Sequence, residues 1–316
     1  MGMGHVQQAV TVAKELRDKA DISFLTKSGE TIVTAIRESG FEATQLPGDP
    51  EILAQLKSLD PDVIVFDKID VNEELARDIK ASLRARLVLF NNLTGANKHA
   101  DVAMIAWYQG GRIENRTFRD SNTLYYYGPK YWVLRPEFYQ YKRKGKVASR
   151  KPEQILLMFG GSDPCHLTPV VLEELLRMDK GYSIAAVLGA HFGPEDSVHQ
   201  VLERYPAKRA NVTVCRNIQN VAELMYKADL VIASPGLSVF EALCVGTPIL
   251  AIPQNALQRD TYQGSIRMLE RDEVGKLKHM MEQSDFTYPQ EQHVASMQIG
   301  EGVSELVEAI LCQGSK

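Results

Sequence analysis

The sequence predicts an α/β fold made of two doubly wound domains, and three observations support this prediction. The chain has 316 residues, about twice the length of an ordinary domain. Short apolar runs with the length of buried strands alternate with helical segments, which is typical of parallel sheets covered on both faces. A polar, basic stretch near the middle of the chain has the composition of a linker.

The first half of the chain contains short apolar runs that we expect to form buried strands. They are residues 21–25, 63–66, 87–90 and 102–105. Helical segments separate several of them, as a doubly wound domain requires. A glycine-containing turn at residues 2–5 has the look of a strand-to-helix turn, yet no residues before it can form the strand. We therefore expect the first strand to lie upstream of Met1 in the natural gene, or to have been lost from this sheet.

The second half repeats the alternation of strands and helices. Its expected strands are 154–159, 183–188, 211–215, 230–233 and 248–252, and its expected helices lie near 168–178, 196–205, 219–227 and 237–245. The basic stretches 141–146 and 149–152 lie between the two halves, and we interpret them as a solvated linker, with a phosphate or membrane-surface role as the alternative. The predicted domains are residues 1–145 and 146–316.

The composition excludes several classes of protein. With 44% hydrophobic and 24% charged residues, the chain has the balance of a globular protein. Its net charge of −4 gives no global electrostatic reason for nucleic-acid binding. The sequence has no apolar run of the roughly 18 to 20 residues that a membrane helix needs, no signal peptide and no C-x-x-C spacing. We expect a cytoplasmic protein without stable membrane insertion, with small-molecule partners and no zinc site.

A glycine and a histidine open the first predicted helix. Gly4 lets the backbone pass close to a ligand, and the amides at a helix start favour an anion. His5 follows at the mouth of the predicted sheet, where ligands bind in doubly wound folds. His5 is therefore a candidate acid or base, although a structural histidine remains the alternative.

Two further loops at strand ends are candidate binding sites. Gly160, Gly161 and Ser162 lie between an apolar strand and a helix, which suits a phosphate or sugar cradle, with a plain turn and helix cap as the alternative. The second loop continues into a predicted helix whose amides would suit a diphosphate. Its residues are Gly236, Leu237 and Ser238, followed by Glu241 one helical turn beyond Leu237. Glu241 is placed to reach a ribose, or is an ordinary first-turn glutamate.

Taken together, these segments resemble the nucleotide-sugar hydrolases of the pseudaminic-acid pathway and the related spore-coat polysaccharide proteins, a branch of the GT-B glycosyltransferase superfamily. The resemblance spans most of the chain. It is carried by residues 2–6 (Gly-Met-Gly-His-Val), 127–138 (Tyr-Gly-Pro-Lys-Tyr through Arg-Pro-Glu-Phe), 159–164 (Phe-Gly-Gly-Ser-Asp-Pro) with 167–168, 217–218 with 225, and 238–243.

The resemblance implies a GT-B-like fold, in which two Rossmann-like domains face a cleft. The second domain would hold UDP, and the first would supply His5 to help water attack the anomeric carbon of the sugar. Free sugar and UDP would be released with inversion, without a metal or cofactor. Asp67 would be the second catalytic residue. The implied sugar contacts are Gly4, Tyr131, Arg135 and Asn255.

We expect backbone groups at Asn217 and Ile218 to read the base, because both residues follow a predicted strand. A plain strand-to-helix turn capped by Asn220 is the alternative.

The chain departs from the family pattern at two positions. Gln8 stands where the family usually has arginine, and Lys68 follows Asp67 where the family often has histidine. These departures keep two alternatives open: a glycosyltransferase that uses the same donor, and a non-catalytic protein that binds nucleotide-sugars. In each case we expect a UDP-sugar partner and a monomer or weak homo-oligomer.

Overall fold

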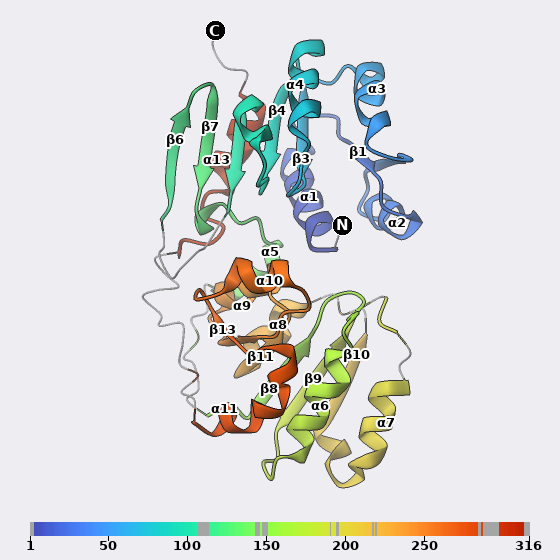
Figure 1. The fold of residues 1–316 in the computed structure, drawn as a ribbon, viewed down its shortest axis with the longest axis vertical. Helices are drawn as coiled ribbons and strands as arrows, with labels where there is room; N and C mark the ends of the chain where they lie inside the picture. The colour runs from blue at the N-terminus through green and yellow to red at the C-terminus, as the bar shows by residue number, and fades with distance from the viewer. Residues whose placement is uncertain are drawn as a thin grey trace. The chain divides into compact units, whose positions relative to one another are not determined.

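The computed structural model describes residues 3–106, 114–142, 146, 151–189, 191–193, 196–216, 218, 220–283, 286 and 297–312. The chain divides into two compact units, each with its own sheets and helices (Figure 1). Unit 1 comprises Met1–Tyr108, Ile113–Arg135 and Met297–Lys316, and unit 2 includes Pro136–Ser296. Both units contain parallel strands connected through helices, so the predicted α/β class is confirmed.

Unit 1 begins with a helix and continues with alternating strands and helices. Its elements are α1 (Met3–Leu16), β1 (Ser23–Thr26), α2 (Glu30–Glu38), β2 (Glu42–Gln45), α3 (Pro50–Leu59), β3 (Val63–Asp67), α4 (Glu73–Ser82), β4 (Arg86–Phe90), the 3₁₀ helix η1 (Gly95–His99), β5 (Val102–Ile105), β6 (Arg116–Asp120), β7 (Thr123–Tyr127), η2 (Pro129–Tyr131) and α13 (Val303–Leu311).

The strands of unit 1 form two separate sheets. One sheet has five strands in the order β3-β4-β5-β7-β6, parallel except for the β6–β7 hairpin, and the other is the parallel pair β1–β2. Helix α1 joins the two, because Val6 and Val10 pack with α2 and β2 while Val12 and Leu16 pack with β4 and β5. In the described part of the chain, no ladder of hydrogen bonds connects β1 to β3.

Unit 2 has a continuous sheet of six parallel strands. Its elements are α5 (Pro136–Lys142), β8 (Gln154–Met158), α6 (Leu167–Arg177), β9 (Ser183–Leu188), α7 (Asp196–Arg204), η3 (Pro206–Asn211), β10 (Val212–Arg216), α8 (Val221–Lys227), β11 (Leu230–Ala233), α9 (Leu237–Val245), β12 (Ile249–Ala251), α10 (Ala256–Tyr262), β13 (Arg267–Met268), η4 (Arg271–Lys276) and α11 (Leu277–Gln283). The strand order is β10-β9-β8-β11-β12-β13. This is the doubly wound Rossmann order, with its reversal between β8 and β11.

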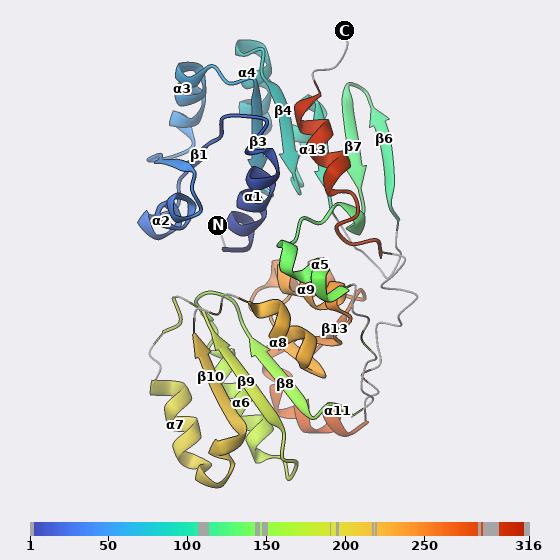
Figure 2. The same cartoon turned by 180° about the vertical axis from the view of Figure 1, so that it is seen from behind.

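The division into units differs from the predicted boundary at residue 145. Helix α5 belongs to unit 2, whereas α13 belongs to unit 1. Figures 1 and 2 show α13 against the larger sheet of unit 1, where Leu306 and Ile310 pack in the same cluster as Val102 and Met104. The return of α13 depends on contacts between residues far apart in sequence, which a linker composition does not reveal.

Residues 143–145 and 149–150 of the basic stretches that we interpreted as a solvated linker lie outside the described residues, but Lys146 itself is partly buried rather than solvated. Its ammonium nitrogen donates hydrogen bonds to the Tyr226 and Ala228 carbonyls and, at 3.1 Å, to the Thr247 hydroxyl. Burial lowers the pKa of Lys146 to about 8. Lys146 therefore anchors this part of the chain to unit 2 at the end of α8.

Among the described residues, no helix is both long enough and apolar enough to cross a membrane.

Candidate functional site

His5 and Asp67 lie together at the carboxyl end of β3. His5 is in the first turn of α1 and Asp67 is the last residue of β3. The His5 Nδ1 and Asp67 Oδ1 atoms are 2.8 Å apart, and 33% of the histidine side chain but only 8% of the aspartate side chain is exposed. The structure thus brings together two residues that are 62 positions apart in sequence. Gly4, which precedes His5, is half-buried at the start of the same helix.

The two groups perturb one another. The hydrogen bond to Asp67 raises the pKa of His5 above its ordinary value, against the opposing effect of burial. Burial raises the pKa of Asp67, and the histidine opposes this rise. When neutral His5 donates its Nδ1 proton to the carboxylate, Nε2 carries the lone pair and is the basic atom. The arrangement suits a general base oriented and stabilised by a buried carboxylate.

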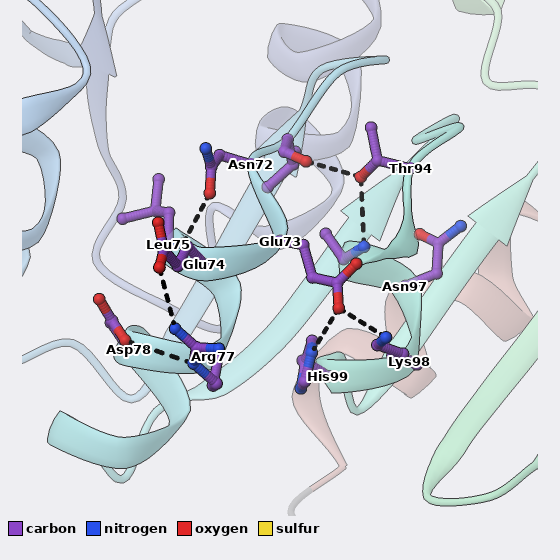
Figure 3. Close-up of polar contacts among 12 residues, drawn as sticks. Asn72, Glu73, Glu74, Leu75, Arg77, Asp78, Thr94, Asn97, Lys98 and His99 are labelled. Carbon is purple, nitrogen blue, oxygen red and sulfur yellow. Dashed lines mark hydrogen bonds and ion pairs between the residues drawn. The ribbon is translucent and has the colours of Figure 1, made fainter.

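A second histidine–carboxylate contact in unit 1 shows what an ordinary surface pair looks like. Glu73, at the start of α4, contacts Lys98 at 2.5 Å and His99 at 3.5 Å (Figure 3). The Glu73 side chain is 45% exposed, and the ion pair with Lys98 is the main cause that lowers its pKa. The neighbouring residue Asn72 caps α4 by accepting from the Leu75 amide. This cluster ties α4 to η1 on the surface, unlike the largely buried Asp67 carboxylate.

The two positions that depart from the family pattern are not equivalent in the structure. Gln8 is only 2% exposed, and its Nε2 has no hydrogen-bond partner in the described part of the chain. Lys68 forms ion pairs with Asp49 at 3.5 Å and Asp70 at 3.4 Å. Position 8 therefore points into unit 1, whereas Lys68 is held by carboxylates after β3.

In unit 2, the loop after β8 presents two glycines and a serine. Gly160 has φ +83°, a conformation that favours glycine, and Gly160 and Ser162 are exposed. Asp163 is 2% exposed and accepts hydrogen bonds from the Leu167 and Thr168 amides at 2.9 and 2.7 Å. Asp163 therefore caps the helix, as the alternative of a turn followed by a helix cap requires. Gly160 and Ser162, which precede Asp163, remain exposed and accessible to a ligand.

Sequence reasoning missed the residue that packs against this loop. A Cβ added at Gly189, just after β9, would lie 2.4 Å from the Cα of Gly161. The Gly161 carbonyl also accepts a hydrogen bond from the His191 amide at 2.9 Å. A glycine directly after a predicted strand was the available signal, since it often marks close backbone approach.

The loop after β11 leads into the amino terminus of α9. Gly236 is the N-cap of α9 and makes no side-chain capping bond, and Leu237 and Ser238 are partly exposed. The first amides of α9 are therefore suited to an anion. The Ser238 hydroxyl donates a hydrogen bond to the Ser234 carbonyl at 3.0 Å. Glu241 is buried, with only 5% of it exposed.

The residues expected to contact the sugar are placed in different environments. Tyr131 packs in a core cluster of unit 1 and is 2% exposed, while its hydroxyl is 3.0 Å from the hydroxyl of the exposed Thr117. This burial argues against the expected sugar contact. Arg135 is half-buried at the end of a segment of unit 1. Asn255 is exposed and caps α10 by accepting from the Gln258 amide at 2.9 Å.

The predicted base-reading segment is described only in part. Asn217 lies outside the described residues, and Ile218 is half-buried. Asn220 caps α8 by accepting a hydrogen bond from the Glu223 amide at 3.2 Å. This is the cap expected of a plain strand-to-helix turn, the alternative to base reading.

The described residues include no group of three or more His, Cys, Asp or Glu side chains placed to hold a metal ion.

Comparisons with known proteins identify two relatives in sequence. No protein-family model matches the chain. Uncharacterized protein MJ1062 of Methanocaldococcus jannaschii is 38% identical over 317 residues, covering 98% of this chain and 63% of the relative. The chain thus spans less than two thirds of that protein's length. The spore coat polysaccharide biosynthesis protein SpsG of Bacillus subtilis is 29% identical over 257 residues, covering 80% of this chain and 74% of SpsG.

Solved structures with the same architecture cover nearly the whole chain. The calicheamicin glycosyltransferase CalG4 has a TM-score of 0.63 at 14% identity, covering 98% of this chain and 94% of its own. MurG of Acinetobacter baumannii has a TM-score of 0.59 at 16% identity, covering 97% and 96%. Anabaena HepE, solved in complex with UDP-glucose, has a TM-score of 0.51 at 15% identity, covering 98% and 92%. The chain therefore has the predicted GT-B glycosyltransferase fold and is homologous to the spore coat polysaccharide biosynthesis protein SpsG.

Proposed function

We propose that this protein is a UDP-sugar hydrolase of surface or flagellar polysaccharide biosynthesis. Unit 2 binds the UDP part of the substrate, and His5 of unit 1 activates water. The 2.8 Å contact between His5 and Asp67 is the observation that carries the proposal. Homology to SpsG, a spore coat polysaccharide biosynthesis protein, supports the pathway. The fold shared with HepE, which was solved with UDP-glucose, supports the ligand class.

In this mechanism, His5 Nε2 accepts a proton from water as the water oxygen bonds to the anomeric carbon. The bond between that carbon and the diphosphate oxygen breaks, and its electron pair leaves with UDP. The buried Asp67 carboxylate stabilises the imidazolium that forms. The products are UDP and a free sugar of inverted configuration, which we propose to be a deoxy amino sugar.

The leaving diphosphate needs compensation of its charge. The amides of Leu237 and Ser238 at the start of α9 supply it, together with the helix dipole and the exposed loop at Gly160. Glu241 follows within α9 and is proposed to contact the ribose. These groups belong to unit 2, whereas the base belongs to unit 1.

The backbone at Ile218 is proposed to read the base as a pyrimidine. Titration calorimetry with UDP and ADP tests this assignment, and we expect UDP to bind more tightly. Equal affinities for UDP and ADP would show that this turn does not recognise the base, and that it is a plain turn capped by Asn220.

A glycosyltransferase is the second candidate, since the His5–Asp67 pair would activate an acceptor hydroxyl as readily as water. A non-catalytic nucleotide-sugar-binding protein is the third, on the ground that Gln8 replaces the expected cation. The experiment is to incubate the protein with a panel of UDP-sugars and measure released UDP. Release in water alone supports the hydrolase, release only with an added acceptor supports the transferase, and binding without release supports the non-catalytic protein.

A further inference from the structure

The side chain of Gln254, three residues beyond β12, contacts the ends of two other strands. Its Nε2 donates a hydrogen bond of 2.9 Å to the Phe159 carbonyl, just after β8. The same nitrogen donates a bond of 2.6 Å to the Ser234 hydroxyl, just after β11. Phe159 is 1% exposed and Ser234 is 8% exposed, so both acceptors are buried. A single amide group therefore links the ends of β8 and β11.

These two strands are the pair at which the strand order of unit 2 reverses. In open parallel sheets, ligands bind outside the carboxyl ends of the strands at this reversal. Phe159 immediately precedes Gly160, and Ser234 lies two residues before Gly236. The acceptors of Gln254 are thus the starting points of both loops that we assign to the diphosphate.

The backbone of Gln254 is itself held in place. Its amide donates to Gln258 Oε1 at 2.8 Å, and its carbonyl accepts from the Cys165 thiol at 3.4 Å. The side-chain amide cannot be reversed, because Oε1 would then face the Phe159 carbonyl. In the observed orientation, Oε1 is buried without a hydrogen-bond partner among the described residues. The side-chain amide of Gln254 therefore uses its NH₂ group but not its oxygen in hydrogen bonds. This favours a role in which the NH₂ group holds its two acceptors at a fixed separation.

We propose that Gln254 is a positioning residue that fixes the separation of the Gly160 and Gly236 loops. This inference rests on the proposed binding of UDP by unit 2, and it deepens that proposal by naming the residue that preorganises the diphosphate site. If the two loops are already held in place, binding does not carry the entropic cost of ordering them, so the affinity for the diphosphate is higher. The base and ribose lie outside this contact, and their binding is independent of it.

The test compares two ligands and two variants by titration calorimetry on the full chain. Gln254→Met keeps the length of the side chain but removes both donated hydrogen bonds. We expect UDP to bind about tenfold more weakly, while affinity for uridine, which lacks the diphosphate, changes less than twofold. Gln200→Ala, which alters an exposed glutamine of α7, is the matched control and should change neither affinity. Ser234→Ala, which removes only one of the two acceptors, should weaken UDP binding by a smaller factor.

Unchanged UDP affinity in Gln254→Met would overturn the inference, as would an equal loss for UDP and uridine. Hydrogen exchange without nucleotide provides a second measurement. In Gln254→Met, the amides of Gly161, Ser162, Leu237 and Ser238 should exchange faster than in the parent and in Gln200→Ala, and unchanged exchange would also overturn the inference. If the parent protein binds neither ligand, the proposed function of unit 2 fails, and the exchange measurement still decides whether Gln254 fixes the loops.

Discussion

The two units carry their candidate chemistry in different ways. Unit 2 has an unbroken six-stranded sheet, and the diphosphate site that we propose for it consists of backbone amides at Gly160 and at the start of α9. Unit 1 has a divided sheet, and its candidate site consists of the side chains of His5 and Asp67. A function carried by side chains can be removed by one substitution, whereas amides survive most substitutions. Turnover and nucleotide affinity should therefore be separable by mutation.

The sharpest test of this contrast is His5→Ala. We expect turnover to fall by roughly two to four orders of magnitude, the usual contribution of a general base. The affinity for UDP should change less than twofold, because we propose that unit 2 holds the nucleotide. Steady-state UDP release and calorimetry measure the two quantities.

His99→Ala is the matched control, since it removes the half-buried histidine of the Glu73 cluster in the same unit (Figure 3). It should retain parental turnover. Parental turnover in a folded His5→Ala protein would make His5 structural and leave Asp67 as the next candidate base.

Asp67→Asn should have the next largest effect. Turnover is expected to fall by roughly one to two orders of magnitude, because the imidazolium loses its buried counter-charge. The rate should rise with pH as His5 loses its proton, and Asp67 raises the pKa of His5 above about 6.5. The midpoint of the rise should therefore lie above that pH in the parent and move to lower pH in the variant. A rate profile between pH 5 and about 9 measures the midpoint, and an unmoved midpoint would show that another group titrates.

Glu241→Ala tests whether unit 2 also depends on a side chain. We expect UDP to bind about tenfold more weakly, because the charged partner that we propose for the ribose is lost. Calorimetry with UDP makes the measurement, with thermal unfolding as a check because Glu241 is buried in α9. Unchanged affinity would remove Glu241 from the site and leave it as an ordinary helix residue.

The smallest effect is expected from Asp163→Ala. The variant loses the two hydrogen bonds to the Leu167 and Thr168 amides, and the free energy of unfolding should fall by about 1 kcal/mol. Asp163→Asn keeps an acceptor and should lose less. Chemical denaturation measures both variants, and equal stability of all three proteins would show that the loop after β8 does not depend on this cap.

The sequence was sufficient to predict the alternation of strands and helices, because buried parallel strands are continuous apolar runs. It did not reveal the β6–β7 hairpin, whose outer strand Arg116–Asp120 is mostly polar and whose turn lacks glycine. Ser121 takes φ +53° in that turn, where Asn-Gly is the usual signal. Nor did it reveal the return of α13, which depends on distant packing.

Like the fold, the candidate site could be predicted from the sequence only in part. His5 and Asp67 were each named as candidates, but the sequence did not show their 2.8 Å contact, because the two residues are 62 positions apart. The sequence did not show that Tyr131 is 2% exposed, because its burial depends on packing with residues as distant in sequence as Leu306. Gln254 carries no motif of its own, and its partners Phe159 and Ser234 are 95 and 20 residues away.

The divided sheet of unit 1 has a consequence for the protein in concentrated solution. In the described part of the chain, β1 pairs only with β2 and β3 only with β4, so each has one edge without a ladder partner. Val65, in the middle of β3, is 41% exposed, and β3 carries no proline or lysine to block a further strand. Apolar edges of this kind are templates for pairing with another chain. Aggregation is therefore expected to begin in unit 1, and a lysine introduced at Val65 is expected to delay it.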